Sequence, residues 1–123
     1  MEPIRPADVV LIAFPLHEPR AHEQEGIRPA VVAATVYARF PLLIVLPLTS
    51  RSGSWVDQFP QVYFRIPAGD ASLPRDSVVL LDQIRSVSIE RIQGRLGRLP
   101  EQRYAMIHQA LLALLEGSCS SAN

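Results

Sequence analysis

Apolar residues are grouped into short runs in the first half of the chain, and Pro, Gly and polar residues separate the runs. Residues 8–14 (DVVLIAF) and 28–36 (RPAVVAATV) are rich in β-branched side chains, which predicts two strands. Residues 41–50 (PLLIVLPLTS) are almost continuously apolar, so we predict a third strand that is buried on both faces. Residues 61–67 (QVYFRIP) alternate, which is typical of an edge or half-exposed strand. A polar loop over 16–26, a flexible loop over 51–60 with the chain's single Trp, and a turn-rich connector over 68–76 are predicted between them.

The second half of the chain predicts further strands and one helix. Residues 77–89 form an apolar strand that we expect to break or bend near Asp82, and 92–99 form a short strand in which Gly94 and Gly97 permit a tight bend. Residues 100–117 are predicted to form a helix that begins at Pro100 and ends at Gly117. Its predicted apolar stripe consists of Tyr104, Ile107, Leu111, Leu114 and Leu115. The pattern therefore predicts a mainly β fold: a small, strongly bent sheet or barrel with a C-terminal helix.

Length and composition limit the class of protein. With 123 residues, the chain is long enough for one core, and we predict a single domain over 1–117 with a disordered tail over 118–123. The only cysteine, Cys119, cannot form an internal disulfide, and no apolar run is long enough to cross a membrane. The N-terminus lacks the pattern of a secretory signal, so we expect a cytoplasmic protein.

Charge argues against a protein that grips long duplex nucleic acid. The formal net charge is zero, with 12 acidic and 12 basic residues. All the basic residues are Arg, whose planar fork of donors suits phosphate groups and stacks on bases. Residues 85–103 hold five Arg and two acidic residues, which forms either a solvated basic face or a contact surface for an anion.

Polar residues interrupt the apolar pattern near the ends of predicted strands. Strand ends and their loops gather at one mouth of a small barrel, so these side chains can converge although they lie far apart in the sequence. A metal site is the weaker interpretation, because no cysteine or spaced carboxylates accompany the histidines. No strained elbow marks a nucleophilic serine, and no Gly-rich phosphate loop is present. The residues concerned are His22, Glu23, Gln24, Arg28, Thr49, Ser50, Asp82, Gln83 and Arg85.

This set of residues suits a reaction at a phosphodiester of RNA, which carries its own nucleophile in the 2′-hydroxyl. Such a reaction needs a base, an acid and donors for the charge that builds on phosphorus, and it needs no metal or cofactor. His22, Glu23 or Asp82 can act as base, Arg28 or Arg85 can hold the phosphate, and Thr49 and Ser50 can donate hydrogen bonds. Structural roles stay open as well. Glu23 and Arg28 can form a salt bridge at the rim, Asp82 can cap a turn, and Thr49 can satisfy a loop carbonyl.

Three motifs in this order resemble the MazF/PemK/Kid toxins of bacterial toxin–antitoxin systems. They are HEQEGIRPAVV (22–32), LPLTS (46–50) and SVVLLDQIRSV (77–87), and the resemblance extends to the DVV strand, the GRLGRL segment and the closing helix, up to Leu115. It implies an SH3-like β-barrel with a C-terminal α-helix, acting as a homodimer. It also implies a metal-independent endoribonuclease that cuts single-stranded RNA and leaves a 2′,3′-cyclic phosphate and a 5′-hydroxyl. A cognate, MazE-like antitoxin with an acidic, disordered tail would cover the site.

The resemblance also implies roles for individual residues. Arg28 resembles the catalytic arginine and Thr49 the strand-end threonine beside the scissile phosphate. Glu23 matches a loop glutamate, His22 a Kid-like histidine that supports the phosphate, and Asp82 a Kid-like aspartate assigned as general base. Leu80 stands where the Kid-like branch has an arginine acid, which shifts the acid role toward Arg28, and Ala7 stands where the family usually has Gly. The RNA-binding candidates are Gln24, Ser50, Arg51, Gln83 and Arg85.

Three other functions compete with this hypothesis. A dimeric barrel of the CcdB type poisons gyrase by binding protein, but that function resides in a C-terminal Trp-Gly-Ile, and this chain ends in SSAN with its Trp at position 55. A catalytically weak barrel that serves as a protein-binding module is a second alternative. A stand-alone ribonuclease without an antitoxin is the third.

Overall fold

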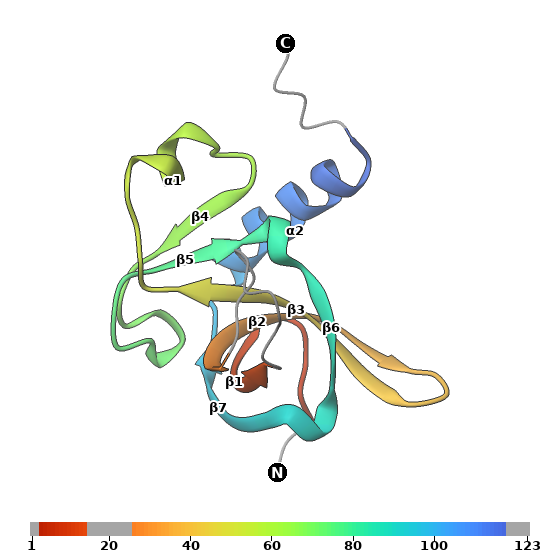
Figure 1. Cartoon of the computed structure of the whole chain (residues 1–123). Helices are drawn as coiled ribbons and strands as arrows, with labels where there is room; N and C mark the ends of the chain where they lie inside the picture. Colours follow the sequence, from red (N-terminus) through yellow and green to blue (C-terminus); the bar gives the residue numbers. More distant parts are fainter. Residues whose placement is uncertain (1–2, 15–25, 118–123) are drawn as a thin grey trace.

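The computed structural model describes residues 3–14 and 26–117, and in these ranges the chain forms a bent antiparallel sheet with one long helix against it (Figure 1). Among the described residues, no helix is long and apolar enough to span a membrane. The strands are β1 (Asp8–Phe14), β2 (Gly26–Tyr37), β3 (Pro41–Thr49), β4 (Tyr63–Ile66), β5 (Ser77–Leu80), β6 (Arg85–Ser88) and β7 (Ile92–Arg98), and the helices are α1 (Ser54–Gln58) and α2 (Glu101–Leu115).

Strand β3 is the centre of the sheet. The order is β4-β5-β3-β2-β1-β7, and β6 also pairs with β3. One edge of β3 pairs with β2, while the other is shared: Leu42–Val45 pair with β6, and Leu48 and Thr49 pair with β5. In the described part of the chain β4 does not pair with β7, so the sheet is strongly bent but not closed. The prediction of a mainly β, barrel-like fold with a C-terminal helix is confirmed.

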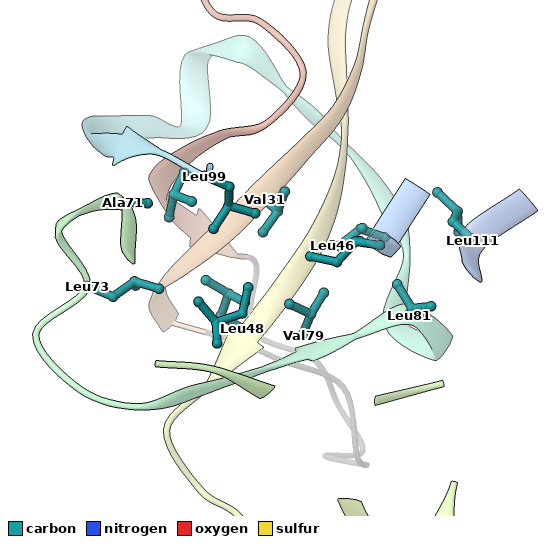
Figure 2. Close-up of a cluster of buried hydrophobic side chains, with 12 residues drawn as sticks. Val31, Leu46, Leu48, Ala71, Leu73, Val79, Leu81, Leu99 and Leu111 are labelled. Atoms are coloured by element: carbon teal, nitrogen blue, oxygen red, sulfur yellow. The ribbon is translucent and has the colours of Figure 1, made fainter. Parts of the chain in front are cut away.

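The core has two parts, on opposite faces of the bent sheet. Val9, Val31, Leu46 and Leu48 lie in the larger part, which α2 covers (Figure 2). The smaller part contains Val10, Ile12 and Phe14 of β1 together with Leu43 and Val45 of β3. Because neighbouring residues of a strand point to opposite faces, β1 and β3 are buried on both sides, as predicted for 41–50.

The predicted helix is present, but its apolar stripe is shorter than predicted. Ile107 and Leu111 are buried in the larger core, and Tyr104 and Leu114 pack against it. Leu115 is 63% exposed, so its place in the stripe was wrong. It is the last residue of α2, one turn beyond Leu111, and it is not among the side chains packed on the core.

The segment 77–89 divides as expected. A 3₁₀ turn, Leu81–Gln83, separates β5 from β6 and carries Asp82, so the predicted break is confirmed. By contrast, the loop predicted over 51–60 contains α1. Val56 of this helix is 2% exposed and packs with Val78 and Leu80, and Trp55 packs against the same cluster, so apolar burial attaches this short helix to the sheet.

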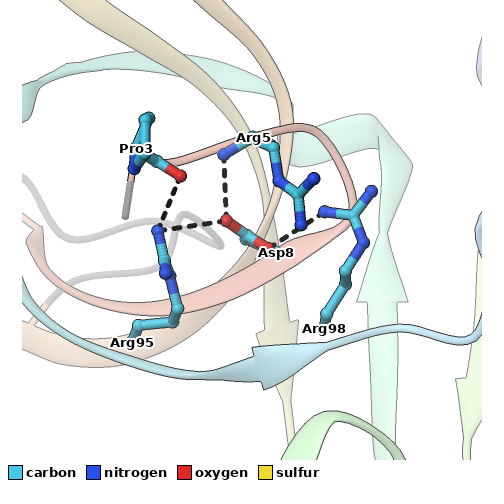
Figure 3. A network of polar contacts seen from close by, with 5 residues as sticks. All are labelled: Pro3, Arg5, Asp8, Arg95 and Arg98. Carbon is cyan, nitrogen blue, oxygen red and sulfur yellow. Dashed lines mark hydrogen bonds and ion pairs between the residues drawn. The ribbon is translucent and has the colours of Figure 1, made fainter. Parts of the chain in front are cut away.

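A buried carboxylate joins the N-terminal segment to β7 (Figure 3). Asp8 is 3% exposed and accepts a 2.9 Å hydrogen bond from the backbone N–H of Arg5. Arg98 Nη1 lies 3.1 Å from Asp8 Oδ1 and Arg95 Nη2 lies 3.4 Å from Oδ2, while Arg95 also donates to the carbonyl of Pro3 at 2.8 Å. Arg95 and Arg98 of the basic segment 85–103 therefore hold the fold together, and Arg91 and Arg103 of the same segment bind the Ala13 carbonyl and the Asp70 carboxylate.

Ala7 and Gly97, two small residues beside this network, have unusual backbone surroundings. Ala7 is buried and has φ 81°, a left-handed conformation that favours the Gly usual at this position of the resembling family. Gly97 lies so close to Ala71 that a Cβ on it would come within 2.7 Å of the Ala71 carbonyl oxygen, whereas Gly94 has open space around it. Strand β7 has two register shifts against β1, and neither of its glycines has a positive φ.

Candidate functional site

A cavity of about 920 Å³ lies where the start of β2, the end of β3, α1, β4 and the turn after β5 come together. Six of the predicted site residues line it, although they come from three separate stretches of the sequence: Arg28, Thr49, Ser50, Arg51, Asp82 and Gln83. The expected convergence at strand ends is therefore present for these residues. Trp55, Phe59, Tyr63, Arg75 and Ser77 also line the cavity.

Arg28 and Thr49 are positioned by the backbone of neighbouring strands. Arg28 lies in β2 opposite Ile12 of β1, and its exposed guanidinium donates a 3.1 Å hydrogen bond to the carbonyl of Ile27. Thr49 is the last residue of β3 and pairs with Val78. Its Oγ1 accepts a 3.1 Å hydrogen bond from the backbone N–H of Arg51, an arrangement that leaves the hydroxyl proton to point elsewhere.

Asp82 has a partner that the sequence did not indicate. The hydroxyl of Tyr63 donates a 2.7 Å hydrogen bond to Asp82 Oδ2, across 19 positions of sequence. This hydrogen bond, followed by burial and the negative charge of Asp82, raises the pKa of Tyr63 to about 12. Tyr63 therefore remains protonated at neutral pH and fixes the orientation of the carboxylate. The alternative role of Asp82 as a turn cap is not seen, since η2 has no side-chain cap.

Arg85 lies apart from the main cavity. It lines a smaller hollow together with Asp82 and Gln83, and its guanidinium carbon lies 5.0 Å from the centre of the Phe14 ring. Such a distance is typical of a cation–π contact, which orients the side chain. Asp82 and Gln83 line both hollows, so the smaller hollow that contains Arg85 lies next to the main cavity.

Three predicted residues cannot be placed. His22, Glu23 and Gln24 lie outside the described residues, and the proposed salt bridge between Glu23 and Arg28 stays a prediction. The predicted tail 118–123 lies outside them as well. Within residues 3–14 and 26–117, no three His, Cys, Asp or Glu side chains are grouped as a metal site requires.

Sequence reasoning missed the aromatic side of the cavity. The Trp55 and Tyr63 rings lie 4.9 Å apart at 88°, and the Phe59 and Tyr63 rings lie 6.3 Å apart at 87°. A signal was present, because two large aromatic residues in a Gly- and Ser-rich loop are unusual unless they pack or bind something. Arg75 was missed because the connector 68–76 reads only as a series of turns.

The charge of the cavity favours an anionic ligand. Its described charged residues are three arginines, Arg28, Arg51 and Arg75, and one acidic residue, Asp82. Although the chain is neutral overall, guanidinium groups thus outnumber carboxylates at this place. A polyanion with planar rings matches both the arginines and the aromatic side.

The comparison with protein families agrees with this site. Residues 5–115 match the model of the PemK-like, MazF-like toxin of type II toxin–antitoxin systems. The chain belongs to this family. The resemblance that the three sequence motifs indicated is therefore confirmed over nearly the whole chain.

Solved MazF structures have the same fold. MazF from Deinococcus radiodurans is 28% identical, with a TM-score of 0.66 over 92% of this chain and 96% of that one. A MazE–MazF structure from the same organism is 26% identical, with a TM-score of 0.64 over the same shares. An endoribonuclease in complex with its cognate antitoxin from a mycobacterial species is 16% identical, with a TM-score of 0.62 over 95% of this chain and 96% of that one, and shares the fold.

Proposed function

We propose that this MazF-like toxin is a metal-independent endoribonuclease that cuts single-stranded mRNA at short sequences. The observation that carries the proposal is the single cavity lined by Arg28, Thr49 and Asp82. When a ribose 2′-hydroxyl attacks the adjacent phosphodiester, a base must take its proton, and cations and hydrogen-bond donors must stabilise the charge on phosphorus. The carboxylate, the guanidinium and the hydroxyl in this cavity are groups of these kinds. Family membership and the endoribonuclease similar in fold support the same activity.

The reaction forms one bond and breaks one. A base removes the proton of the 2′-hydroxyl, the 2′-oxygen bonds to phosphorus, and the bond from phosphorus to the 5′-oxygen breaks as that oxygen receives a proton. The products are a 2′,3′-cyclic phosphate and a 5′-hydroxyl. Neither oxidation nor a cofactor is involved, so the protein supplies a base, an acid and charge stabilisation.

Arg28 and Thr49 act at the phosphate in this proposal. The guanidinium of Arg28 stabilises the negative charge on the phosphate oxygens and assists the leaving 5′-oxygen. Thr49 donates its hydroxyl proton to a phosphate oxygen while its own oxygen accepts from Arg51. Leu80, which replaces the arginine of the Kid-like branch, is 5% exposed and apolar, so Arg28 takes over that role.

Asp82 is the base that the described residues favour. Its carboxylate is exposed, lines the cavity and is oriented by the hydroxyl of Tyr63. His22 and Glu23 stay the alternative bases or phosphate-supporting groups. Gln24, Ser50, Arg51, Gln83 and Arg85 are proposed to hold the RNA chain on either side of the scissile phosphate.

The proposed partners follow from the same family. We propose that the toxin acts as a homodimer in the cytoplasm and that a cognate, MazE-like antitoxin neutralises it. The solved MazE–MazF structure and the mycobacterial complex support this pairing. An acidic, disordered antitoxin tail would find three arginines in the cavity and would fold as it binds.

The deciding experiment is cleavage of a long single-stranded RNA in EDTA by the wild-type protein and the Arg28→Ala variant. We expect cuts at one recurrent short sequence, ending in cyclic phosphate, and a loss of roughly 10²-fold or more in the variant. Arg39→Ala is the matched control, because Arg39 is exposed and lies outside the cavity. Intact RNA with folded wild-type protein would point instead to a protein-binding toxin.

A further inference from the structure

We propose that Trp55, Phe59 and Tyr63 form a binding site for an unpaired nucleobase next to the scissile phosphate. We refer to these three residues as the aromatic wall. The inference rests on the proposed RNA-cleaving function and adds a subsite to it. The aromatic wall lines the same open cavity as Arg28 and Thr49, so a nucleotide whose phosphate meets Arg28 can place its base against the aromatic wall.

The rings are arranged as a shelf with an accessible outer side. Trp55 and Phe59 both stand nearly perpendicular to Tyr63, at 88° and 87°. Trp55 and Tyr63 pack against Val78 and Leu80 at the back, whereas Phe59 is 51% exposed. An exposed phenylalanine beside two half-buried aromatic rings leaves apolar surface for one more planar group.

The shelf is held in place before any ligand binds. Val56 anchors α1 in the core, and the Asp57 carboxylate accepts hydrogen bonds from Arg65 of β4 at 3.2 and 3.4 Å. The carbonyl of Phe59 accepts hydrogen bonds from the backbone N–H groups of residues 62 and 63, at 3.0 and 3.1 Å. Because these contacts fix both ends of the segment, little conformational entropy is lost when a base stacks on it.

Gly53 shapes the position of the indole. A Cβ on Gly53 would lie 3.1 Å from Cδ1 and 3.2 Å from Nε1 of Trp55, so the indole ring lies close against the glycine backbone. Glycine thus allows a close approach of the ring to the chain.

The chemistry of the cavity favours a nucleotide over an apolar peptide. Three arginines line the cavity together with the aromatic wall, and the combination of guanidinium groups with stacking rings is typical of single-stranded RNA sites. Tyr63 belongs both to the proposed base site and to the proposed catalytic site, because its ring contacts Trp55 and its hydroxyl binds Asp82. A base bound by the aromatic wall therefore lies beside the proposed catalytic carboxylate.

The sole Trp of the chain makes a direct test possible. The probe is a short single-stranded RNA with 2′-O-methyl groups, which binds but cannot be cut, added to the wild-type protein while Trp fluorescence is recorded. We expect strong quenching as a base stacks on the aromatic wall beside Trp55, and weak quenching by an abasic strand of the same length. Equal quenching by the two strands, or none at saturating RNA, would overturn the inference.

Cleavage patterns give an independent readout. Phe59→Ala, at an exposed position that should not disturb folding, should bind the probe about 5- to 100-fold more weakly. Trp55→Phe keeps a ring and should also bind more weakly; because this variant has no Trp, binding is measured for both variants by the fluorescence anisotropy of an end-labelled probe. Both should also cut long RNA at altered sequences, as mapped by sequencing the 5′-hydroxyl ends. Phe40→Ala is the control, because Phe40 is 63% exposed and lies outside the cavity.

The two proposals fail in different ways. If the wild-type protein cuts RNA in EDTA but Phe59→Ala and Trp55→Phe cut the same sequences at the same rate, the aromatic wall is not a base site and the ribonuclease function stands. If the probe quenches Trp55 but no RNA is cut, the base site stands and the proposed cleavage is wrong.

Discussion

The hydroxyl of Tyr63 binds the carboxylate of Asp82 at 2.7 Å, and this contact raises the pKa of the tyrosine to about 12 from an ordinary 10.0. A raised pKa in the folded state means that the contribution to stability is complete below about pH 10 and is lost as the pH rises through about 12. We expect an ultraviolet titration to show a tyrosine that ionises near pH 12. Tyr63→Phe should remove this component, and identical curves for both proteins would contradict the assignment.

The same contact has a consequence for catalysis. Tyr63→Phe keeps the ring that packs on Trp55 but removes the hydroxyl that orients Asp82. We expect kcat to fall about tenfold, because Asp82 stays present but less well oriented. Asp82→Asn should lose roughly 10²-fold or more, as expected for removal of a general base. If both variants cut RNA at the wild-type rate, Glu23 or His22 is the base.

The hydroxyl of Thr49 is expected to matter more than its shape. Thr49→Val keeps the volume but removes the donor to the phosphate and the acceptor for Arg51. We expect kcat/KM to fall by about 10- to 100-fold, the range for loss of one hydrogen bond that strengthens in the transition state. The control is Thr35→Val in β2, outside the cavity, which should leave activity unchanged.

The glycines of β7 are predicted to differ in what they tolerate. Gly97→Ala would place a Cβ 2.7 Å from the backbone of Ala71, so we expect a loss of about 1–3 kcal/mol in the free energy of unfolding. Gly94→Ala meets nothing within 4 Å and should be neutral or stabilising by up to about 1 kcal/mol. Urea unfolding of the two variants checks the prediction, and equal stability of both would contradict it.

The buried Asp8 is expected to contribute far more to stability than an exposed carboxylate with similar ion-pair geometry. Asp8→Asn removes the charge that faces Arg95 and Arg98, and we expect a loss of about 2–3 kcal/mol because both guanidinium groups partly reach solvent. Asp57→Asn breaks the ion pair between Asp57 and Arg65, whose side chains are 74% and 51% exposed, respectively. This loss should lower the free energy of unfolding by less than about 1 kcal/mol. Denaturant midpoints compare the two.

Much of the fold was predictable because burial leaves a local pattern. The runs at 8–14 and 41–50 are strands buried on both faces, and the polar interruption at Asp82 marks a real break between β5 and β6. The helix α1 was missed because one turn of helix with a single buried side chain, Val56, has no period to detect. Leu115 was misplaced because its spacing continues the stripe, whereas its exposure depends on where the sheet ends.

The candidate site was predictable in part: the gathering of strand ends at one mouth of a small barrel predicted that these residues can converge, and the resemblance then implied their individual roles. Composition could not bring Arg28, Thr49 and Asp82 together, since their convergence depends on the pairing of β3 with two other strands. The contact between Tyr63 and Asp82 left no trace in the sequence, because tyrosine in an alternating strand reads as ordinary packing. The role of the segment that contains His22 stays a prediction.

The shared edge of β3 determines when this toxin becomes complete during its own synthesis. Arg28 and Thr49 emerge from the ribosome early, on β2 and β3, but the cavity needs β5 and the turn with Asp82, which are translated later and must fold back onto β3. A nascent chain that ends before Asp82 lacks one side of the cavity. Under the proposed function, the nascent toxin therefore cannot cleave mRNA, including its own message, until the ribosome has translated most of that message.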